Sequence, residues 1–514
     1  MKFLLTTLSL LFISTSIAQT NTKISTANFF EGEPYLTIDP SNDQHLIAAW
    51  MGFKISEAIV IKTSNSYNGG LTWSTPNAIA HEQTGNTSAD VSLGYNSNGV
   101  LFICYIDFDN TNFTNGKIIV RKSIDNGLNW GTSVEAINIT DCPNQLCIDR
   151  PWMVIDNMDR IFITTMNADQ PTLVNAPYHP YFVVSSDDGN TFTTPNSFDG
   201  TNFLAGSVIK QPTPAPAIGA DGTFYATYPS YVFAQDFNAQ MFLAKSTNAG
   251  SSFNYTTIYT GSDAVSDPFA KKGFVLVTDP TAPNHIGLIA LYDINGDSDV
   301  YYSETIDGIT WTALQRVNQD PIANGKMQDL VWGDFNSNGD LAICWRDRRN
   351  ATSNGYQTET EIFGAVKFKD SSTFSNDFVI SSQQVSHDAI LEGSGNDFMH
   401  VQFQADTIYA VWGDVRTGTL NIFINKTNVT TGVSSLSEIY TEKGILSIFP
   451  NPSEKEIQLK SFELITNVEL YNSRGEFIQK IEHQKTNIQQ LHIGEYLIIY
   501  TYKGKRFCTK FIKN

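Results

Sequence analysis

Two kinds of short apolar segment alternate along most of the chain, and both have the length of a β-strand. Segments such as PYLTIDPSNDQHLIAAW, VSLGYNSNGVLFICY and DLVWGDFNSNGDLAICW read as a strand, a polar turn and a second strand that ends in an aromatic residue. Shorter strand-like runs such as AIVIKT, KIIVRK and MFLAK follow them. The pattern restarts near residues 35, 90, 150, 214, 274, 328 and 398. It predicts seven all-β units of four strands each; the unit from 274 is the least regular, so six units is the alternative.

A polar turn with one consensus follows the third strand in five of these units. Its copies are SYNGGLTW, SIDNGLNW, SSDDGNTF, STNAGSSF and TIDGITW, and the closing aromatic residues fall at 73, 130, 192, 253 and 311. The Asp or Asn side chain can bond nearby backbone amides, and the Gly can take a positive φ. The aromatic residue re-enters the sheet and buries a large apolar area. We therefore interpret the turn as structural, with these key residues: Asn68, Gly70, Trp73, Asp125, Gly127, Trp130, Asp187, Gly189, Phe192, Asn248, Gly250, Phe253, Asp307, Gly308 and Trp311.

The repeated turn resembles the Asp box, or BNR repeat, of sialidase-like β-propellers. The resemblance implies an all-β fold, a β-propeller with one four-stranded blade per unit. Sialidases of this type usually have six blades, whereas the repeats here favour seven. The resemblance also implies a protein that acts on or binds extracellular glycans or glycoproteins, with glycoside hydrolysis as one activity and non-catalytic binding of glycan or protein as the alternative.

The two ends of the chain differ in character from the repeats. Residues 1–18 have one Lys, an apolar run and Ser-Ile-Ala before Gln19, as in a secretory signal peptide. Residues 19–442 hold the propeller, and residues 443–514 form a separate strand-rich segment, for which we expect a small β-sandwich. Its FPNP, the segment from Tyr471 to Gly475, GEY and the closing KFIK resemble the type A (Por) sorting domain of type IX secretion cargo in Bacteroidetes. The resemblance implies export through the periplasm and outer membrane to the surface or medium, with the type IX machinery as partner and no transmembrane segment after signal cleavage.

Charge and cysteine content narrow the function classes. The chain carries a net charge of −19, with about −24 on residues 19–442 and +4 on residues 443–514. An acidic propeller disfavours non-specific binding to nucleic acid or anionic membranes. Cys142 and Cys147 lie in one loop and could form a disulfide in an oxidising compartment, whereas Cys104 and Cys344 sit at equivalent strand positions of two units, where buried apolar roles are expected.

Strand order predicts which face of the propeller carries chemistry. In a four-stranded meander, the Asp-box turns share one face with the turns between the first and second strands. The opposite face collects the ends of second strands and the starts of first strands, where propeller sites usually form. Glu33, Asp90 and Asp329 map to strand starts on this face. The catalytic candidates are Asp149, Arg150, Asp347, Arg349, Asp414 and Arg416, and the ligand-binding candidates are Arg150, Arg346, Arg348, Asp107 and Asp293. Arginine forks bind carboxylates, and paired carboxylates can supply the acid and base of glycoside cleavage.

Each candidate has a structural alternative. Trp345 to Arg349 and Trp412 to Arg416 share one W-x-D-x-R motif, so their Asp and Arg could form ion pairs that tie a loop to its strand. Arg150 is less repetitive and is the best single candidate. The sialidase resemblance would also imply an Arg-Ile-Pro motif, which this sequence lacks, so an enzyme and a binding propeller both stay open. No cofactor is expected; calcium is considered for the loops 334–340 and 293–299, where a plain turn is the alternative.

Overall fold

The computed structural model describes residues 21–26, 29–55, 58–168, 170, 172–175, 177–206, 212–261, 273–387, 396–429, 446–461, 464–472, 477–481, 483–502 and 505–514. It divides into two compact units, Met1–Val429 and Thr430–Asn514. The predicted signal peptide lies outside the described residues.

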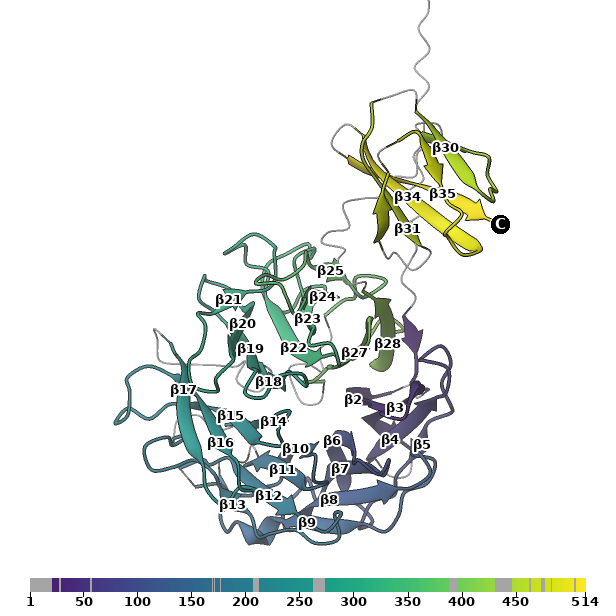
Figure 1. Cartoon of the computed structure of the whole chain (residues 1–514). Coiled ribbons are helices and arrows are strands. Elements are labelled where there is room, and N and C mark those ends of the chain that lie inside the picture. Colours follow the sequence, from purple (N-terminus) through teal and green to yellow (C-terminus); the bar gives the residue numbers. More distant parts are fainter. Residues whose placement is uncertain are drawn as a thin grey trace, which may run out of the picture. The chain divides into compact units, whose positions relative to one another are not determined.

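The described part of the first unit is a seven-bladed β-propeller, in which seven four-stranded antiparallel sheets surround a common centre (Figure 1). The innermost strands are β2 (Glu31–Asp39), β6 (Thr87–Tyr95), β10 (Asp149–Ile155), β14 (Ala215–Ile218), β18 (Phe274–Thr278), β22 (Gln328–Phe335) and β26 (His400–Gln404). The second strands are β3 (Asn42–Lys54), β7 (Leu101–Phe108), β11 (Ile161–Met166), β15 (Phe224–Ser230), β19 (Ile286–Tyr292), β23 (Leu341–Asp347) and β27 (Thr407–Asp414). The seven predicted units therefore correspond to seven blades, including the irregular unit from 274.

The outer half of each blade is shorter and less regular. The third strands are β4 (Ala58–Ser66), β8 (Gly116–Ser123), β12 (Tyr181–Ser185), β16 (Gln240–Ser246), β20 (Asp299–Thr305), β24 (Glu361–Lys367) and β28 (Asn421–Asn428). The fourth strands of the first six blades are β5 (Asn77–Ala78), β9 (Val134–Asn138), β13 (Asn196–Ser197), β17 (Asn254–Thr260), β21 (Gln315–Arg316) and β25 (Phe378–Val379). A single 3-10 turn, η1 (Ile139–Asp141), follows β9 among the described residues.

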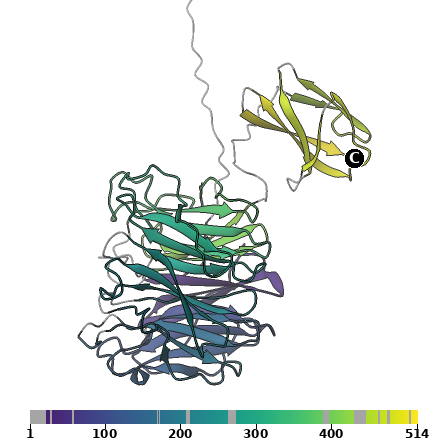
Figure 2. The same cartoon turned by 60° about the vertical axis from the view of Figure 1, so that its left-hand side comes forward.

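The ring is closed by the N-terminal end of the propeller. Strand β1 (Thr22–Lys23) supplies the outer strand of the seventh blade by pairing with β28, with Thr22 opposite Ile424. Figure 2 shows the purple N-terminal strands lying beside the green strands of that blade. The closure also pairs the Ser25 hydroxyl with Asn421 at 2.8 Å. Because of this closure, no blade edge is left unpaired between the first and last repeats. The repeat pattern alone does not specify the closure.

The hydrophobic core lies between neighbouring blades. Leu46, Ala48 and Trp50 of the first blade pack with Tyr409 and Val411 of the seventh in one buried cluster. Similar clusters join the other neighbouring blades, for example the sixth with the seventh. Because each blade buries both faces against its neighbours, its strands are apolar on both sides, which is why the sequence shows apolar runs rather than strict alternation.

The recurring polar turns form the hydrogen bonds that their residue types suggest. In SSDDGNTF, the Ser185 hydroxyl donates to Asp187 at 2.8 Å and accepts the N–H of Gly189 at 2.9 Å. Gly189 has a φ of 73°, in the left-handed region that favours glycine. The carboxylate of Asp187 accepts the N–H of Thr191 at 2.9 Å. Asn68, Asp125, Asn248 and Asp307 accept corresponding backbone bonds in the other copies.

We expect Ser185→Ala to lower the free energy of unfolding of the propeller by about 1 kcal/mol, because the buried hydroxyl bonds both the carboxylate and an amide of the turn. Tryptophan fluorescence during urea unfolding reports this unit, since all eight Trp residues precede residue 430. Ser186→Ala, at the exposed neighbouring position, is the matched control. Equal effects of the two substitutions would contradict the structural role of the turn.

The second unit has two sheets packed over one core. One sheet holds β29 (Leu446–Phe449), β30 (Glu456–Ser461) and β33 (Lys485–Asn487). The other holds β32 (Phe477–Lys480), β31 (Thr466–Asn472), β34 (Gly494–Tyr502) and β35 (Lys505–Lys513). Residues from both sheets, among them Ile457, Leu470, Ile498 and Phe511, share one buried cluster. The unit is therefore the small β-sandwich that the sequence predicts.

Candidate functional site

The innermost strands lie nearest to the centre of the propeller (Figure 1). Strand register gives each blade an equivalent position on its innermost strand, occupied by Tyr35, Ser92, Trp152, Ala215, Val275, Trp332 and His400. We call these seven residues the aromatic layer, after the rings of Tyr35, Trp152, Trp332 and His400. Two residues further along the same strands lie Thr37, Gly94, Val154, Ala217, Val277, Asp334 and Gln402, which we call the lower layer.

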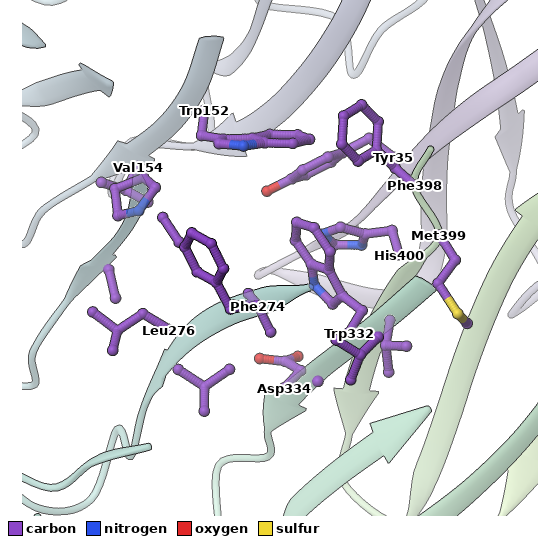
Figure 3. Close-up of a pocket in the computed structure, with 18 of the residues that line it drawn as sticks. Tyr35, Trp152, Val154, Phe274, Leu276, Trp332, Asp334, Phe398, Met399 and His400 are labelled. Carbon is purple, nitrogen blue, oxygen red and sulfur yellow. The ribbon is translucent and has the colours of Figure 1, made fainter. Parts of the chain in front are cut away.

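A cavity of about 230 Å³ lies among these strands, and we call it the axial cavity. Figure 3 shows Tyr35, Trp152, Trp332 and Phe274 around it, with the Tyr35 hydroxyl and the Asp334 carboxylate turned into the space. The rings support one another: the Trp152 and Trp332 centroids are 5.6 Å apart, and those of Trp152 and Phe398 are 4.9 Å apart. The described lining includes the carboxylates of Asp334 and Asp397 and no Lys or Arg.

Backbone bulges precede the aromatic layer in several blades. The pairing of first and second strands shifts between Gly32 and Tyr35, and between Asp149 and Trp152. Within the shifts, Glu33 has a φ of 54° and Arg150 has a φ of 53°. Asp90 repeats the same conformation in the second blade, with a φ of 53°. A bulge bends its strand and changes the direction of a side chain, and non-glycine residues rarely adopt a positive φ without compensating contacts. The bulges bring these three side chains to one end of the axis.

Glu33, Asp90, Arg150 and Asp397 form a buried charged group, which we call the Arg150 cluster. The Arg150 guanidinium binds Asp397 at 2.8 Å and lies 4.5 Å from the centre of the Phe398 ring. The backbone N–H of Arg150 donates to Asp90 at 3.2 Å, and the N–H of Asp397 donates to Glu33 at 3.3 Å. All four residues are at most 9% exposed. The cluster thus places three carboxylates around one guanidinium.

Burial favours the protonated form of one carboxyl in the Arg150 cluster. Burial raises the pKa of Glu33 well above its usual value, and the nearby Asp90 and Asp397 raise it further. The positive charge of Arg150 opposes this shift without cancelling it. A carboxyl with a raised pKa beside a second carboxyl is an arrangement suited to acid and base catalysis.

The lower layer adds a second titrating carboxyl. Burial raises the pKa of Asp334 to about 7, although the N–H groups of Phe403 and Phe335 oppose the shift. Burial also lowers the pKa of His400 to about 3, so its imidazole is neutral at pH 7. Burial and then the charge of Asp334 raise the pKa of Tyr35, which keeps that hydroxyl protonated. Asp334 is therefore the one side chain of the aromatic and lower layers that titrates near neutrality.

The predicted W-x-D-x-R residues lie elsewhere, in local ion pairs. The Trp345 indole donates to Asp347 at 2.7 Å, and Arg349 binds Asp347 and Asp377, each at 2.7 Å. In the next blade, the Trp412 indole donates to Asp414 at 2.8 Å, and Arg416 binds Asp414 at 2.6 Å. These contacts tie each loop to its own strand, as the structural alternative states. None of the four Asp and Arg residues of the motifs lines the axial cavity.

Arg346 and Arg348 converge on one buried carboxylate. Arg346 donates to Asp329 through Nε at 2.7 Å and also through Nη2. Arg348 donates to the same carboxylate at 3.1 Å and to the carbonyl of Tyr356 at 2.7 Å. Burial raises the pKa of Asp329, but the two guanidinium groups outweigh it and hold that pKa far below the usual range. The two predicted ligand-binding arginines are thus engaged within the protein.

The remaining predicted residues are spread over the same face. Asp107 accepts from His81 at 3.1 Å and Ser88 at 3.0 Å; burial raises its pKa, but these bonds and one from Asn86 outweigh burial and lower it. Asp149 begins β10 directly before Arg150, and Asp293 is exposed. The Cys142–Cys147 disulfide lies in the loop before β10, and the carbonyls of Cys147 and Asp149 both accept from Thr165.

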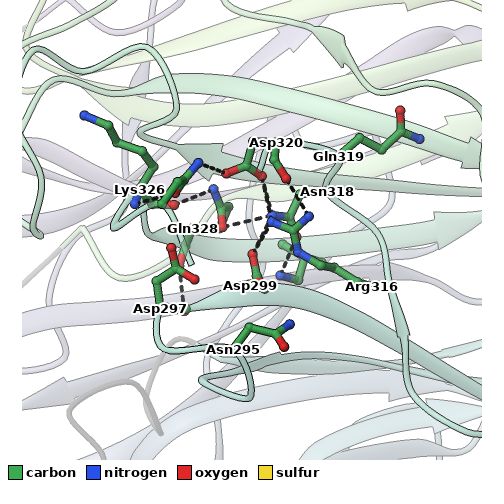
Figure 4. A network of polar contacts seen from close by, with 12 residues as sticks. Asn295, Asp297, Asp299, Arg316, Asn318, Gln319, Asp320, Lys326 and Gln328 are labelled. Carbon is green, nitrogen blue, oxygen red and sulfur yellow. Dashed lines mark hydrogen bonds and ion pairs between the residues drawn. The ribbon is translucent and has the colours of Figure 1, made fainter. Parts of the chain in front are cut away.

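Polar side chains of both loops considered for calcium accept hydrogen bonds within the protein. Asp297 accepts the N–H of Gly325 at 2.8 Å, and Asp299 accepts from Arg316 at 2.7 Å (Figure 4). In the other loop, Asn336 accepts the N–H of Asp340 at 2.9 Å, as in a plain turn. Across the described ranges, no three His, Cys, Asp or Glu side chains are grouped so that they could hold a metal ion.

Several residues of the axial cavity escaped the sequence analysis. Trp152, Trp332, His400, Asp334 and Asp397 were not among its candidates, although Trp152 and Trp332 were visible inside the repeats. The signal was positional: PYL, PWM and LVW each carry a bulky ring at one equivalent strand position. Aligning the innermost strands blade by blade could have found the aromatic layer.

The comparisons with known proteins identify the second unit. Residues 447–514 match the family described as a secretion system C-terminal sorting domain. This unit is a sorting domain. It directs the chain to type IX secretion and so to the cell surface or the extracellular space, as the sequence predicts. Within the part of the chain that the structure describes, no helix is long and apolar enough to cross a membrane.

No curated protein matches the chain by sequence. Among solved structures, a protein of unknown function from Dyadobacter fermentans is 12% identical, with a TM-score of 0.42, covering 68% of this chain and 98% of that one. An α-L-arabinanase of Penicillium chrysogenum is 12% identical, with a TM-score of 0.45 and coverage of 80% and 98%. The Hadza microbial sialidase Hz136 is 13% identical, with a TM-score of 0.42 and coverage of 76% and 74%. The sorting domain is therefore the part of the chain with a family match.

Proposed function

We propose that the exported propeller is a sialidase-like Asp-box propeller that binds a sugar residue of an extracellular glycan in the axial cavity. The observation that carries this proposal is the wall formed by Tyr35, Trp152 and Trp332 beside the Asp334 carboxylate. Asp397 is a second acidic residue of the lining. Aromatic faces stack on the apolar faces of sugar rings, and carboxylates accept hydrogen bonds from sugar hydroxyls.

The size of the cavity supports a single residue as the ligand. Its volume of about 230 Å³ lies below the roughly 300–1,000 Å³ of sites for drug-sized ligands. One sugar ring held among the aromatic side chains would be largely desolvated, which strengthens its polar contacts with the carboxylates. The rest of a glycan would then extend out of the cavity.

The Arg150 cluster makes glycoside hydrolysis the leading activity. Asp397 lines the cavity and is oriented by Arg150, so it is the carboxylate assigned to face the sugar as base or nucleophile. Glu33 lies next to it, and the raised pKa of Glu33 suits a proton donor. Cleavage of a glycosidic bond needs one carboxyl that donates a proton and one that is ionised. We assign the first role to Glu33 and the second to Asp397.

Non-catalytic binding is the second candidate function. It is favoured by the arginines of the W-x-D-x-R motifs, which bind carboxylates in their own blades, and by the absence of an Arg-Ile-Pro motif. In this alternative, the axial cavity binds a sugar, and the Arg150 cluster has only a structural role, in which it links the beginnings of innermost strands.

Calorimetry with a panel of glycans, run beside turnover of chromogenic glycosides, tests the proposal. We expect Trp332→Ala to weaken glycan binding about tenfold through the lost stacking, while Trp73→Ala, in an Asp-box turn, leaves binding unchanged. Turnover that disappears in Asp397→Asn with binding retained would support the hydrolase. Binding without turnover in the wild-type protein would support the second candidate. No binding of any glycan, or equal loss in both Trp variants, would overturn a sugar site in the axial cavity.

A further inference from the structure

We propose that the sugar bound in the axial cavity carries an ammonium group, which is seated against the Asp334 carboxylate at the lower layer. The inference rests on the proposed function and specifies its ligand: a glycan containing a free, unacetylated amino sugar. It differs from the anionic sugar that a sialidase resemblance would suggest.

The shape of the cavity provides the first argument. Asp334 projects into the space that Tyr35, Trp332 and Phe274 surround, with Trp152 above them in Figure 3. Aromatic rings attract a cation over their faces, and this attraction is strongest when the cation is shielded from water. Several rings with a carboxylate at one end therefore form a cage for an organic ammonium rather than for a carboxylate.

Charge gives the second argument. The two acidic side chains of the described lining differ in their partners: Asp397 is paired with Arg150, whereas Asp334 forms no ion pair among the described residues. Asp334 accepts the N–H of Phe403 at 2.9 Å, which does not neutralise a charge. Since no Lys or Arg is in the described lining, an anionic sugar would meet two carboxylates with no free cation, and an ammonium would supply the missing charge.

The coupling between ligand binding and the protonation of Asp334 gives the third argument. It also gives a measurable quantity, the number of protons released on binding. Burial raises the pKa of Asp334 to about 7, so this carboxyl is partly protonated at neutral pH in the free protein. The other titratable groups that line the cavity are Tyr35, His400 and Asp397. Tyr35 stays protonated because its pKa is raised, and His400 stays neutral because its pKa is lowered. An ammonium that binds Asp334 favours the ionised carboxylate, so binding of a ligand whose amine is already protonated should release a proton from Asp334.

The ammonium could belong to an amino sugar or to a choline-like group, and the same calorimetric experiment separates these sources. Full-length protein is titrated at about pH 6, where the sugar amines are largely protonated, with a glucosamine oligosaccharide, with the N-acetylated oligosaccharide of equal length, and with choline. Each titration is repeated in two buffers that differ in ionisation enthalpy, so that proton release is counted directly. Asp334→Asn removes the charge at nearly constant shape, and Asp293→Asn, an exposed carboxylate outside the cavity, is the control.

The expected result is that the glucosamine oligosaccharide binds roughly tenfold or more tightly than its acetylated counterpart and releases protons. Asp334→Asn should abolish both the preference and the release, and Asp293→Asn should change neither. Equal binding of both oligosaccharides, unaffected by Asp334→Asn, would overturn the ammonium inference and leave the sugar site standing. Binding of choline without either oligosaccharide would support ammonium recognition by Asp334 and overturn the sugar as its source.

Discussion

Arg150→Met is expected to lower the free energy of unfolding of the propeller by about 3–5 kcal/mol, the cost of removing one partner from a buried ion pair. Arg150 is 4% exposed and is the one cation of the Arg150 cluster. Met conserves most of the apolar contact with Phe398 but leaves Glu33, Asp90 and Asp397 without a compensating charge. Urea unfolding followed by tryptophan fluorescence measures the effect.

The penalty of Arg150→Met should depend on pH in a defined direction. Removing the guanidinium leaves buried carboxylates without their cation, and burying an unpaired carboxylate costs stability only once the pH exceeds its unfolded pKa of about 4. The penalty is therefore largest at pH 7 and shrinks as the pH falls toward 4. Lys117→Met is the control, because its ion pair with Glu135 is about one-third exposed and should contribute less than about 1 kcal/mol. An equal loss of unfolding free energy in both variants, or a loss in Arg150→Met that does not depend on pH, would contradict this description of the cluster.

Asp329→Asn is expected to cost about 3–5 kcal/mol as well, because it leaves the buried guanidinium groups of Arg346 and Arg348 without their shared carboxylate. The pKa of Asp329 is held far below its usual range, so its stabilising contribution is complete above the unfolded pKa of about 4. That contribution declines as the pH falls below 4, and the difference between variant and wild type should narrow there.

The same urea titrations at pH 7 and pH 3 measure the effect of Asp329→Asn, with the exposed Asp293→Asn as the control. If Asp329 were merely a surface partner, both substitutions would fall within about 0.5 kcal/mol of wild type. That outcome would mean that Arg346 and Arg348 are available to a ligand rather than engaged within the sixth blade.

Much of the architecture was readable from the sequence because each repeat carries its own local signals. The recurring polar turns mark the end of the third strand in five blades, since Ser185, Asp187 and Gly189 bond one another within one loop. The seven strand pairs and the C-terminal sandwich follow from apolar runs separated by polar turns. The closure by β1 was not predicted, because two residues near Thr22 carry no strand signal without their partner in β28.

Only part of the candidate site could be predicted from the sequence, because its residues come from different blades. Arg150 was singled out, but its partner Asp397 lies in the seventh blade, and the ring closure that brings them within 2.8 Å is not a local property. Asp334 was read as the start of a polar turn, because its burial depends on strands of other blades. The W-x-D-x-R motifs attracted attention by their repetition, and in the structure that repetition corresponds to the same ion pair formed twice.

The central claim, that a sugar binds in the axial cavity, is tested most directly by a crystal structure of the full-length protein with the tightest-binding glycan of the calorimetric panel. The account predicts one sugar ring in the cavity, stacked against Trp152 or Trp332, within hydrogen-bonding distance of Asp334 or Asp397. A glycan bound on another surface, for example at the polar network around Asp299 and Arg316 in Figure 4, with an empty axial cavity, would contradict it.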